Sequence, residues 1–313
     1  MKSVAVRSAL VLSFLGLSWI ATLSAQQLAG EQPTPRFRSS ADVVTIQAAV
    51  RNGRGRPVAG LTAADFEIRD NGQLRPVLSL RSDAGSPVSL AILVDMSGSM
   101  AISPKLAMAR QALASVLSQL RPGEDEAAVF TFDSALHDRH AFTKDPSRLA
   151  GALDNMKPYG TTSLYDATAA AARRLSERSA SHKAIVVLTD GIDTSSRYTA
   201  PEVSGLASSI AVPVYVMATV PSIDQRMMME AVERSDQSNA ADLRDLAEWT
   251  GGQLVFASNL TETTTAAVDL LAELRQQYVI AIEAVAAREW RRLDVRVKRP
   301  SAIVRARNGY YGG

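Results

Sequence analysis

Residues 94–100 read VDMSGSM, in which three oxygen-bearing side chains alternate with small or apolar residues at the end of an apolar run. They are the Asp95 carboxylate and the Ser97 and Ser99 hydroxyls. Taken alone the pattern is weak, because Asp and Ser often close a turn or cap a helix. A tight turn at Gly98, however, would let both serines face one point. The stretch is therefore either a capped loop or a site for an ion.

Two further loops carry groups of the same kind. Thr162 lies in GTTSLYDA, just before a helix expected to begin near Leu164, and Asp190 lies in TDG after an apolar run. Together the three loops supply two carboxylates and three hydroxyls, with no histidine and no thiol. Such an oxygen-only set suits Mg²⁺ or a similar ion and is poor for zinc or copper. Because hydroxyls donate no formal charge, the ion would keep much of its own charge and could accept a carboxylate from outside.

The elements around these loops should bring them together. VSLAILVD (88–95) is an uninterrupted apolar run, typical of a strand that is covered on both faces. Further strands are expected at 127–132, 137–142, 183–190, 212–219 and 253–257, and helices at 104–120, 145–156, 163–178, 200–211, 240–252 and 260–277. This alternation predicts an α/β fold, a doubly wound and mostly parallel sheet with helices on both faces. Such sheets bind ligands at the carboxyl ends of their strands, where VDMSGSM and TDG fall.

Both ends of the mature chain read as β structure. Strands are expected at Val43–Val50, Asp65–Arg69 and Pro76–Leu80, with turns at Asn52-Gly53 and Asp70-Asn71-Gly72. The tail is again strand-like in YVIAIEAV, RRLDVRVKR and AIVRARNGYYGG. Each flank alone would leave strand edges and an apolar face exposed, so we expect the two to pair into one small β domain.

The N-terminus has the pattern of a secretory signal. Lys2 and Arg7 precede an apolar run from Ala9 to about Ala21, and small residues predict cleavage after Ala25. The alternative is an uncleaved membrane anchor, although the run is short for a full span. We therefore expect an exported protein, located in the periplasm, the cell envelope or outside the cell. The predicted division is signal peptide 1–25, linker 26–40, N-terminal β module 41–86, α/β domain 87–276, and C-terminal β segment 277–313 packing with 41–86.

Composition excludes several classes of function. None of the 313 residues is cysteine, which excludes thiolate metal sites, thiol nucleophiles and a lipidated-cysteine anchor. The predicted signal holds two of the 34 Lys and Arg and no acidic residue, so 32 basic residues balance 32 acidic ones and nothing points to nucleic acid. The chain has no G-x-S-x-G elbow, phosphate-binding P-loop or G-x-G-x-x-G, so we expect it not to be an enzyme.

Neighbouring polar residues have simpler interpretations. Ser163 and Asp166 offer a capping-box-like pair for the helix that follows Thr162. Asp193, in TDGIDTSS, is interpreted as a solvated loop acid rather than as a residue that supports a metal ligand without binding the metal itself. The histidines have no spacing typical of a metal site or a triad and are expected at the surface or at strand edges; they are His137, His140 and His182.

Together, D-x-S-x-S, the threonine of the second loop and the TDG of the third resemble the metal-ion-dependent adhesion site of von Willebrand factor type A (VWFA) domains. The resemblance implies that Ser97 and Ser99 bind the metal directly. It implies that Thr162 binds directly or through water according to state, and that Asp95 and Asp190 act largely through water. The implied ion is Mg²⁺, with Mn²⁺ or Ca²⁺ as alternatives.

Segments along most of the chain are similar to the bacterial VWFA-related family described chiefly from Acidobacteria. In order they are VAGLTAADFEIRDNGQ, ILVDMSGSM, TSLYDA, LTDGIDTSS, LRDLAEWTGG and RVKRPSAIVRARNGYYG, covering roughly Ala41 to Gly312. One departure is Thr161, which stands where related loops often have a second glycine.

The resemblance implies an exported interaction or adhesion module whose metal captures an Asp or Glu carboxylate of a partner protein. The balanced charge gives no reason to expect nucleic acid as a partner, and a membrane is expected only if the signal segment is uncleaved. In relatives, ligation can be coupled to displacement of the last helix, here Leu260–Gln276. The alternative functions are a structural component of envelope assembly with an incidental metal and, more distantly, a metal-dependent hydrolase.

Overall fold

A computed structural model describes residues 43–311 apart from 83–84, 103, 181, 192, 210, 221–225, 228, 231–238 and 287. The chain divides into Met1–Ser40 and a compact unit, Ala41–Gly313. The predicted signal peptide and linker thus lie outside the described residues. In the part that is described, no helix has the length and apolar character needed to cross a membrane.

A six-stranded sheet forms the centre of the α/β part of the compact unit, in the order β10-β9-β8-β5-β6-β7. Its strands are β5 (Val88–Asp95), β6 (Glu126–Phe132), β7 (Leu136–Thr143), β8 (His182–Thr189), β9 (Val214–Thr219) and β10 (Leu254–Ala257). Neighbouring strands pair in parallel except at the edge, where β7 runs antiparallel to β6. All eight residues of β5 are buried, which explains its uninterrupted apolar sequence.

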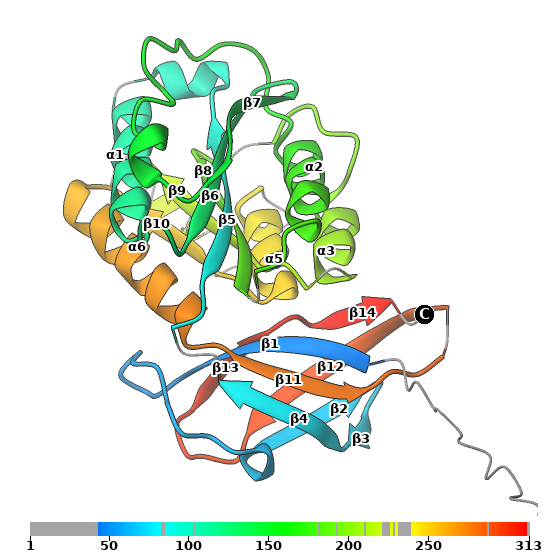
Figure 1. Ribbon diagram of the computed structural model, residues 1–313. Helices are drawn as coiled ribbons and strands as arrows, with labels where there is room; N and C mark the ends of the chain where they lie inside the picture. Colours follow the sequence, from blue (N-terminus) through cyan, green and yellow to red (C-terminus); the bar gives the residue numbers. More distant parts are fainter. Residues whose placement is uncertain are drawn as a thin grey trace, which may run out of the picture. The chain divides into compact units, whose positions relative to one another are not determined.

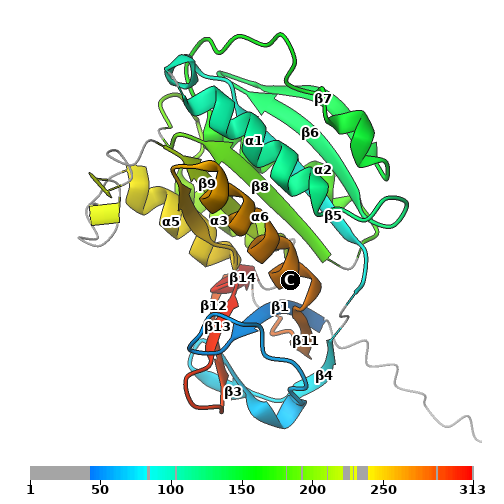
Figure 2. The ribbon, with the colours of Figure 1, turned by 90° about the vertical axis from the view of Figure 1, so that its left-hand side faces the viewer.

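Helices cover both faces of this sheet (Figures 1 and 2). Helices α1 (Lys105–Ser118) and α6 (Leu260–Arg275) lie on one face, and α2 (Leu164–Ser176), α3 (Ala200–Ser209) and α5 (Asn239–Thr250) lie on the other. Alternate residues of β5 serve the two cores: Leu90 and Ile92 pack with α1 and α6, whereas Ala91 and Leu93 pack on the opposite side. The predicted doubly wound α/β fold is therefore confirmed.

Strands from the two flanks pair with each other in two four-stranded sheets. One has the order β13-β1-β11-β4 and the other β14-β12-β2-β3. The strands before the α/β part are β1 (Val43–Arg51), β2 (Phe66–Asp70), β3 (Gln73–Arg75) and β4 (Val77–Ser82), and η1 (Ala63–Asp65) is a short 3-10 helix. Those after it are β11 (Tyr278–Glu283), β12 (Trp290–Val297), β13 (Ile303–Ala306) and β14 (Gly309–Tyr311). Residues of both flanks share one apolar core, in which the rings of Phe66 and Tyr278 meet edge to face.

Two local predictions were wrong. The expected helix at 145–156 is only a 3-10 turn, η3 (Pro146–Leu149), followed by turns in which Asn155 adopts a positive φ of 57°. His182, expected at the surface or an edge, is fully buried at the start of β8.

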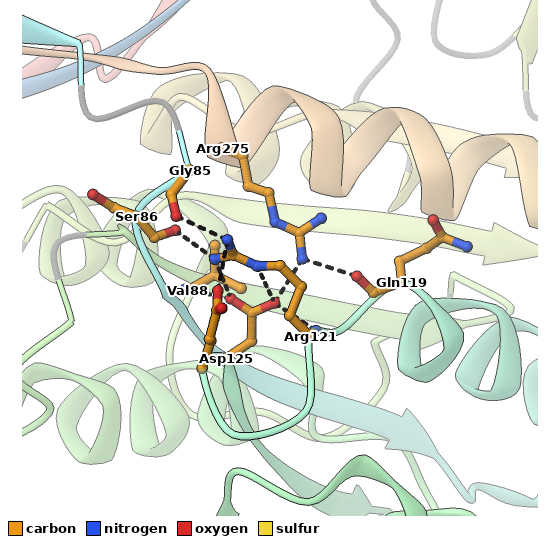
Figure 3. A network of polar contacts seen from close by, with 8 residues as sticks. Gly85, Ser86, Val88, Gln119, Arg121, Asp125 and Arg275 are labelled. Carbon is orange, nitrogen blue, oxygen red and sulfur yellow. Dashed lines mark hydrogen bonds and ion pairs between the residues drawn. The ribbon is translucent and has the colours of Figure 1, made fainter.

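The amino ends of the central strands are held by one buried carboxylate, that of Asp125 (Figure 3). Asp125 accepts hydrogen bonds from the backbone N–H groups of Val88 (3.0 Å) and Arg121 (2.7 Å). It also pairs with the guanidinium groups of Arg121 (3.0 Å) and Arg275 (2.6 Å). The start of β5, the loop after α1 and the last turn of α6 therefore meet at one group.

The same arginines extend the network into the chain that enters β5. Arg121 donates to the carbonyl oxygens of Gly85 (2.9 Å) and Ser86 (3.1 Å), and Arg275 donates to that of Gln119 (2.8 Å). Burial raises the pKa of Asp125, but the hydrogen bonds from Arg121, Val88 and Arg275 outweigh it and lower the pKa to about 2.

We expect Asp125→Asn to lower the free energy of unfolding by about 3 kcal/mol, because it leaves two partly buried guanidinium groups without their carboxylate. Urea denaturation measures the change. The matched control is Asp294→Asn, which removes the carboxylate of an exposed pair with Arg296 (2.7 Å) and should cost less than about 1 kcal/mol. Equal losses in the two variants would contradict the role of Asp125.

Asp125 also predicts a dependence of stability on acid. Its pKa is about 2 in the folded protein against an ordinary 3.8, so the unfolded chain takes up this proton first as the pH falls. The stabilisation is complete above about pH 5 and is lost as the pH falls towards 2, a change of about 2 kcal/mol. Urea denaturation should show that, between pH 5 and pH 2, the free energy of unfolding falls by about 2 kcal/mol less in Asp125→Asn than in the wild type. Parallel curves would contradict the assignment.

Candidate metal centre

The predicted ligand residues lie at the carboxyl ends of two adjacent strands and in the loop before α2. Asp95 is the last residue of β5, and Asp190 directly follows β8. These strands pair in parallel with Val94 opposite Leu188, so their ends coincide at the same edge of the sheet. Ser97 precedes the short 3-10 helix η2 (Gly98–Ala101).

Backbone hydrogen bonds hold the D-x-S-x-S loop against the loop that leads to Thr162. The N–H of Gly98 donates to the carbonyl oxygen of Gly160 (2.9 Å), and that of Tyr159 donates to Met96 (2.8 Å). A Cβ atom at position 98 would lie 3.3 Å from the Gly160 oxygen, so the close approach favours glycine. Two of the three predicted loops are thus in direct contact.

Asp95 is fully buried and held at both oxygens. Its Oδ1 accepts from the backbone N–H of Ser97 (2.8 Å), and its Oδ2 accepts from the hydroxyl of Thr189 (2.6 Å). Burial raises the pKa of Asp95 to about 6, a shift that these hydrogen bonds oppose and the nearby charge of Asp190 increases. The hydroxyl oxygens of Ser97 and Ser99 lie 3.0 Å apart beside this carboxylate.

Asp190 is also buried, but only one of its oxygens is paired. Oδ2 accepts from the ammonium of Lys105 at 2.8 Å. Oδ1 is buried and finds no hydrogen-bond partner among the described residues. A buried carboxylate oxygen of this kind is rare in folded proteins and indicates a place for a positively charged or hydrogen-bonding group.

Thr162 is buried and fixed through its backbone by the loop after β8. Its N–H donates to the hydroxyl of Thr194 (2.9 Å), and its carbonyl accepts from the N–H groups of Thr194 (2.9 Å) and Ser195 (3.0 Å). The structure therefore links the second and third predicted loops as well.

Asp193 also joins those two loops, and its interpretation as a solvated loop acid was wrong. Its Oδ2 accepts from the N–H groups of Leu164 (2.8 Å) and Tyr165 (3.3 Å), the first residues of α2. The expected Ser163 cap does not form. The Ser163 hydroxyl instead lies 2.8 Å from the Ser195 hydroxyl. Asp193 thus caps a helix from a distant part of the chain.

The donor chemistry of this centre suits a hard divalent cation. Among the described residues no group of three His, Asp or Glu could hold a metal, so an ion here would depend on hydroxyl oxygens. The paired hydroxyls of Ser97 and Ser99 and the unpaired Oδ1 of Asp190 provide such oxygens. Sequence reasoning missed Thr189 and Lys105, which bond to the carboxylates.

Comparison with known proteins gives one family match. Residues 90–192 match the family described as von Willebrand factor type A domain, and all five predicted ligand residues fall inside this range. No curated protein matches the chain.

Several solved structures are similar. An aerotolerance-related membrane protein from Bacteroides fragilis NCTC 9343 is 19% identical, with a TM-score of 0.47 over 60% of this chain and 98% of that one. The PilB minor pilin from Streptococcus sanguinis is 14% identical, with a TM-score of 0.46 over 61% and 62%. Proximal thread matrix protein 1 from the mussel byssus, with zinc in its metal-ion-dependent adhesion site (MIDAS) motif, is 15% identical. Its TM-score is 0.48 over 72% of this chain and 50% of that one. At these identities a likeness concerns the fold and not the ligands.

We expect Asp193→Ala to destabilise the protein by about 1 kcal/mol and to weaken binding of Mn²⁺, since the carboxylate joins the loops of Thr162 and Asp190. Denaturation and calorimetric titration measure the two effects. The matched control is Asp145→Ala, which removes a cap bond to the N–H of Ser147 (3.1 Å) in η3. It should alter stability comparably and leave Mn²⁺ binding unchanged. A loss of Mn²⁺ affinity in both variants would show that the link through Asp193 has no special role.

Proposed function

We propose that this chain, which carries a von Willebrand factor type A domain at residues 90–192, is an exported interaction module that captures a carboxylate of a partner protein through a bound divalent cation. The observation that carries the proposal is the buried, unpartnered Oδ1 of Asp190 at the strand end next to Asp95. We also propose that the module is not catalytic, and that the VWFA domain extends over 87–276 and is flanked by the β segments.

The chain's own residues would hold the cation in the following roles. Ser97 and Ser99 would offer their hydroxyls, which lie 3.0 Å apart, and the buried Thr162 would offer a third. Asp95 is held by the hydroxyl of Thr189 and the N–H of Ser97, and so offers a negative charge in a fixed position next to Ser97. The ion itself, Mg²⁺ in our proposal with Mn²⁺ or Ca²⁺ as substitutes, supplies a position that an external carboxylate can occupy.

Apolar side chains beside the centre support a protein as the partner. Tyr159 is 83% exposed and Ile102 is 61% exposed. Their backbone N–H groups bond to the carbonyl oxygens of Met96 (2.8 Å) and Ser99 (3.2 Å), so both residues flank the D-x-S-x-S loop. When the carboxylate belongs to a partner protein, apolar side chains around it on the partner can pack against Tyr159 and Ile102. A free small anion has no such side chains.

Export is proposed from the sequence of residues 1–25, with its two cations and apolar run. A weak divalent-ion site is compatible with that location, because extracellular Ca²⁺-binding modules work with dissociation constants of roughly 10⁻⁴ to 10⁻³ M.

The test of the metal site is a titration with Mg²⁺ and Mn²⁺ followed by thermal unfolding. The wild type should gain melting temperature with the ion and lose the gain in EDTA, because an ion that binds only the folded state stabilises it. Ser97→Ala should abolish most of the gain. The control Ser118→Ala, whose hydroxyl bonds to the carbonyl of Ser115 (2.8 Å) within α1, should respond as the wild type does. An identical response of all three proteins would refute the site.

The carboxylate specificity is tested with acetate on the Mn²⁺-loaded protein. Acetate should displace water from the ion and lower the paramagnetic relaxation of water protons, with acetamide as the neutral control of the same shape. No difference between acetate and acetamide would argue against capture of a carboxylate and leave the metal site itself standing.

A further inference from the structure

The position of Lys105 is unusual for its place in the sequence. It is the first residue of α1, a helix whose N-terminal turn carries no acidic residue and whose N-cap, Pro104, makes no side-chain cap bond. A cation at a helix N-terminus is unfavourable, because the exposed N–H groups give that end a partial positive charge. Local helix chemistry therefore does not account for a lysine here.

The partner of Lys105 accounts for it instead. Its ammonium lies 2.8 Å from Oδ2 of Asp190, with side-chain exposures of 13% for the lysine and 1% for the aspartate. The two residues are 85 positions apart, so the pair forms only in the folded protein. Lys105 thus places a positive charge at the carboxylate that the proposed function assigns to the metal.

The contact between Lys105 and Asp190 determines the net charge of the centre. Asp95 receives its hydrogen bonds from neutral groups, and among the described residues Lys105 is the cation bonded to Asp190. With both carboxylates ionised, the centre carries one negative charge in excess. A divalent cation changes this to one positive charge, and one external carboxylate then makes the centre neutral. Without Lys105 the metal-loaded centre would already be neutral.

We propose that Lys105 is a tethered cation that competes with the divalent ion for Asp190. It lowers metal affinity and leaves the loaded centre with a positive charge that favours an incoming carboxylate. The inference rests on the proposed function and assigns its regulation to one residue. An ammonium on a flexible stem suits this role, because it can leave Asp190 without any change of backbone.

Two substitutions at this position should act in opposite directions. Lys105→Gln removes the competing charge, so Mn²⁺ should bind at least about tenfold more tightly. About tenfold is the scale for a unit charge acting on a divalent ion a few ångströms away in water, and the partly buried pair is screened less than that. Lys105→Arg keeps the charge and adds a planar group that can pair with both oxygens of Asp190, so Mn²⁺ should bind several-fold more weakly. Lys298→Gln is the control, since this lysine of the β flank bonds to the carbonyl of Ala64 (3.1 Å).

Isothermal titration with Mn²⁺, the probe ion, measures the four affinities, and thermal unfolding in EDTA gives a readout without metal. In EDTA, Lys105→Gln should melt below the wild type because Asp190 loses its cation, and Mn²⁺ should raise its melting temperature more than that of the wild type. Because Lys105→Arg keeps the ion pair, its reduced affinity tests the proposal even if Lys105→Gln does not fold.

If the wild type binds Mn²⁺ but Lys105→Gln has no higher affinity for it, or Lys105→Arg has no lower affinity, the role of Lys105 alone would be overturned. The proposed metal site would then stand. An absence of Mn²⁺ binding in all four proteins would overturn both the site and the competition.

Discussion

Two buried carboxylates at the ends of adjacent parallel strands are the constraint on which this structure depends. Asp95 and Asp190 must lie close together because β5 and β8 pair in parallel and end at the same edge. Like charges brought together without water are costly, and the raised pKa of Asp95 reflects both the burial and the neighbour. Thr189, the backbone of Ser97 and the ammonium of Lys105 offset part of this cost. The unpaired oxygen of Asp190 is what remains for a cation.

The sequence was informative where a residue's role follows from its own strand or loop. The apolar run of β5, the turn at Asn71-Gly72 and the position of Asp190 after β8 follow from local patterns. The roles of Lys105 and Asp193 do not, because each depends on a partner in another loop, 85 and 29 positions away. The alternation of elements showed that the loops share one edge, but not which side chains would touch.

The last helix, α6, is joined to the β flanks through another buried acid. Glu273 of α6 is 2% exposed and pairs with Arg51 of β1 (2.7 Å) and Arg305 of β13 (3.3 Å). It also accepts from the hydroxyl of Tyr215 in β9 (3.0 Å), whose pKa burial raises. Any displacement of α6, as the family resemblance implies for relatives, would have to break these contacts and that of Arg275 with Asp125. The flanks thus hold the helix that a ligand-coupled movement would use.

The most direct test of the account is the anomalous scattering of Mn²⁺ in crystals of the wild-type protein. We predict one strong peak at the carboxyl end of β5, at metal–oxygen bonding distance from the hydroxyls of Ser97 and Ser99. A map without a peak at this position in crystals grown with millimolar Mn²⁺ would contradict the metal site.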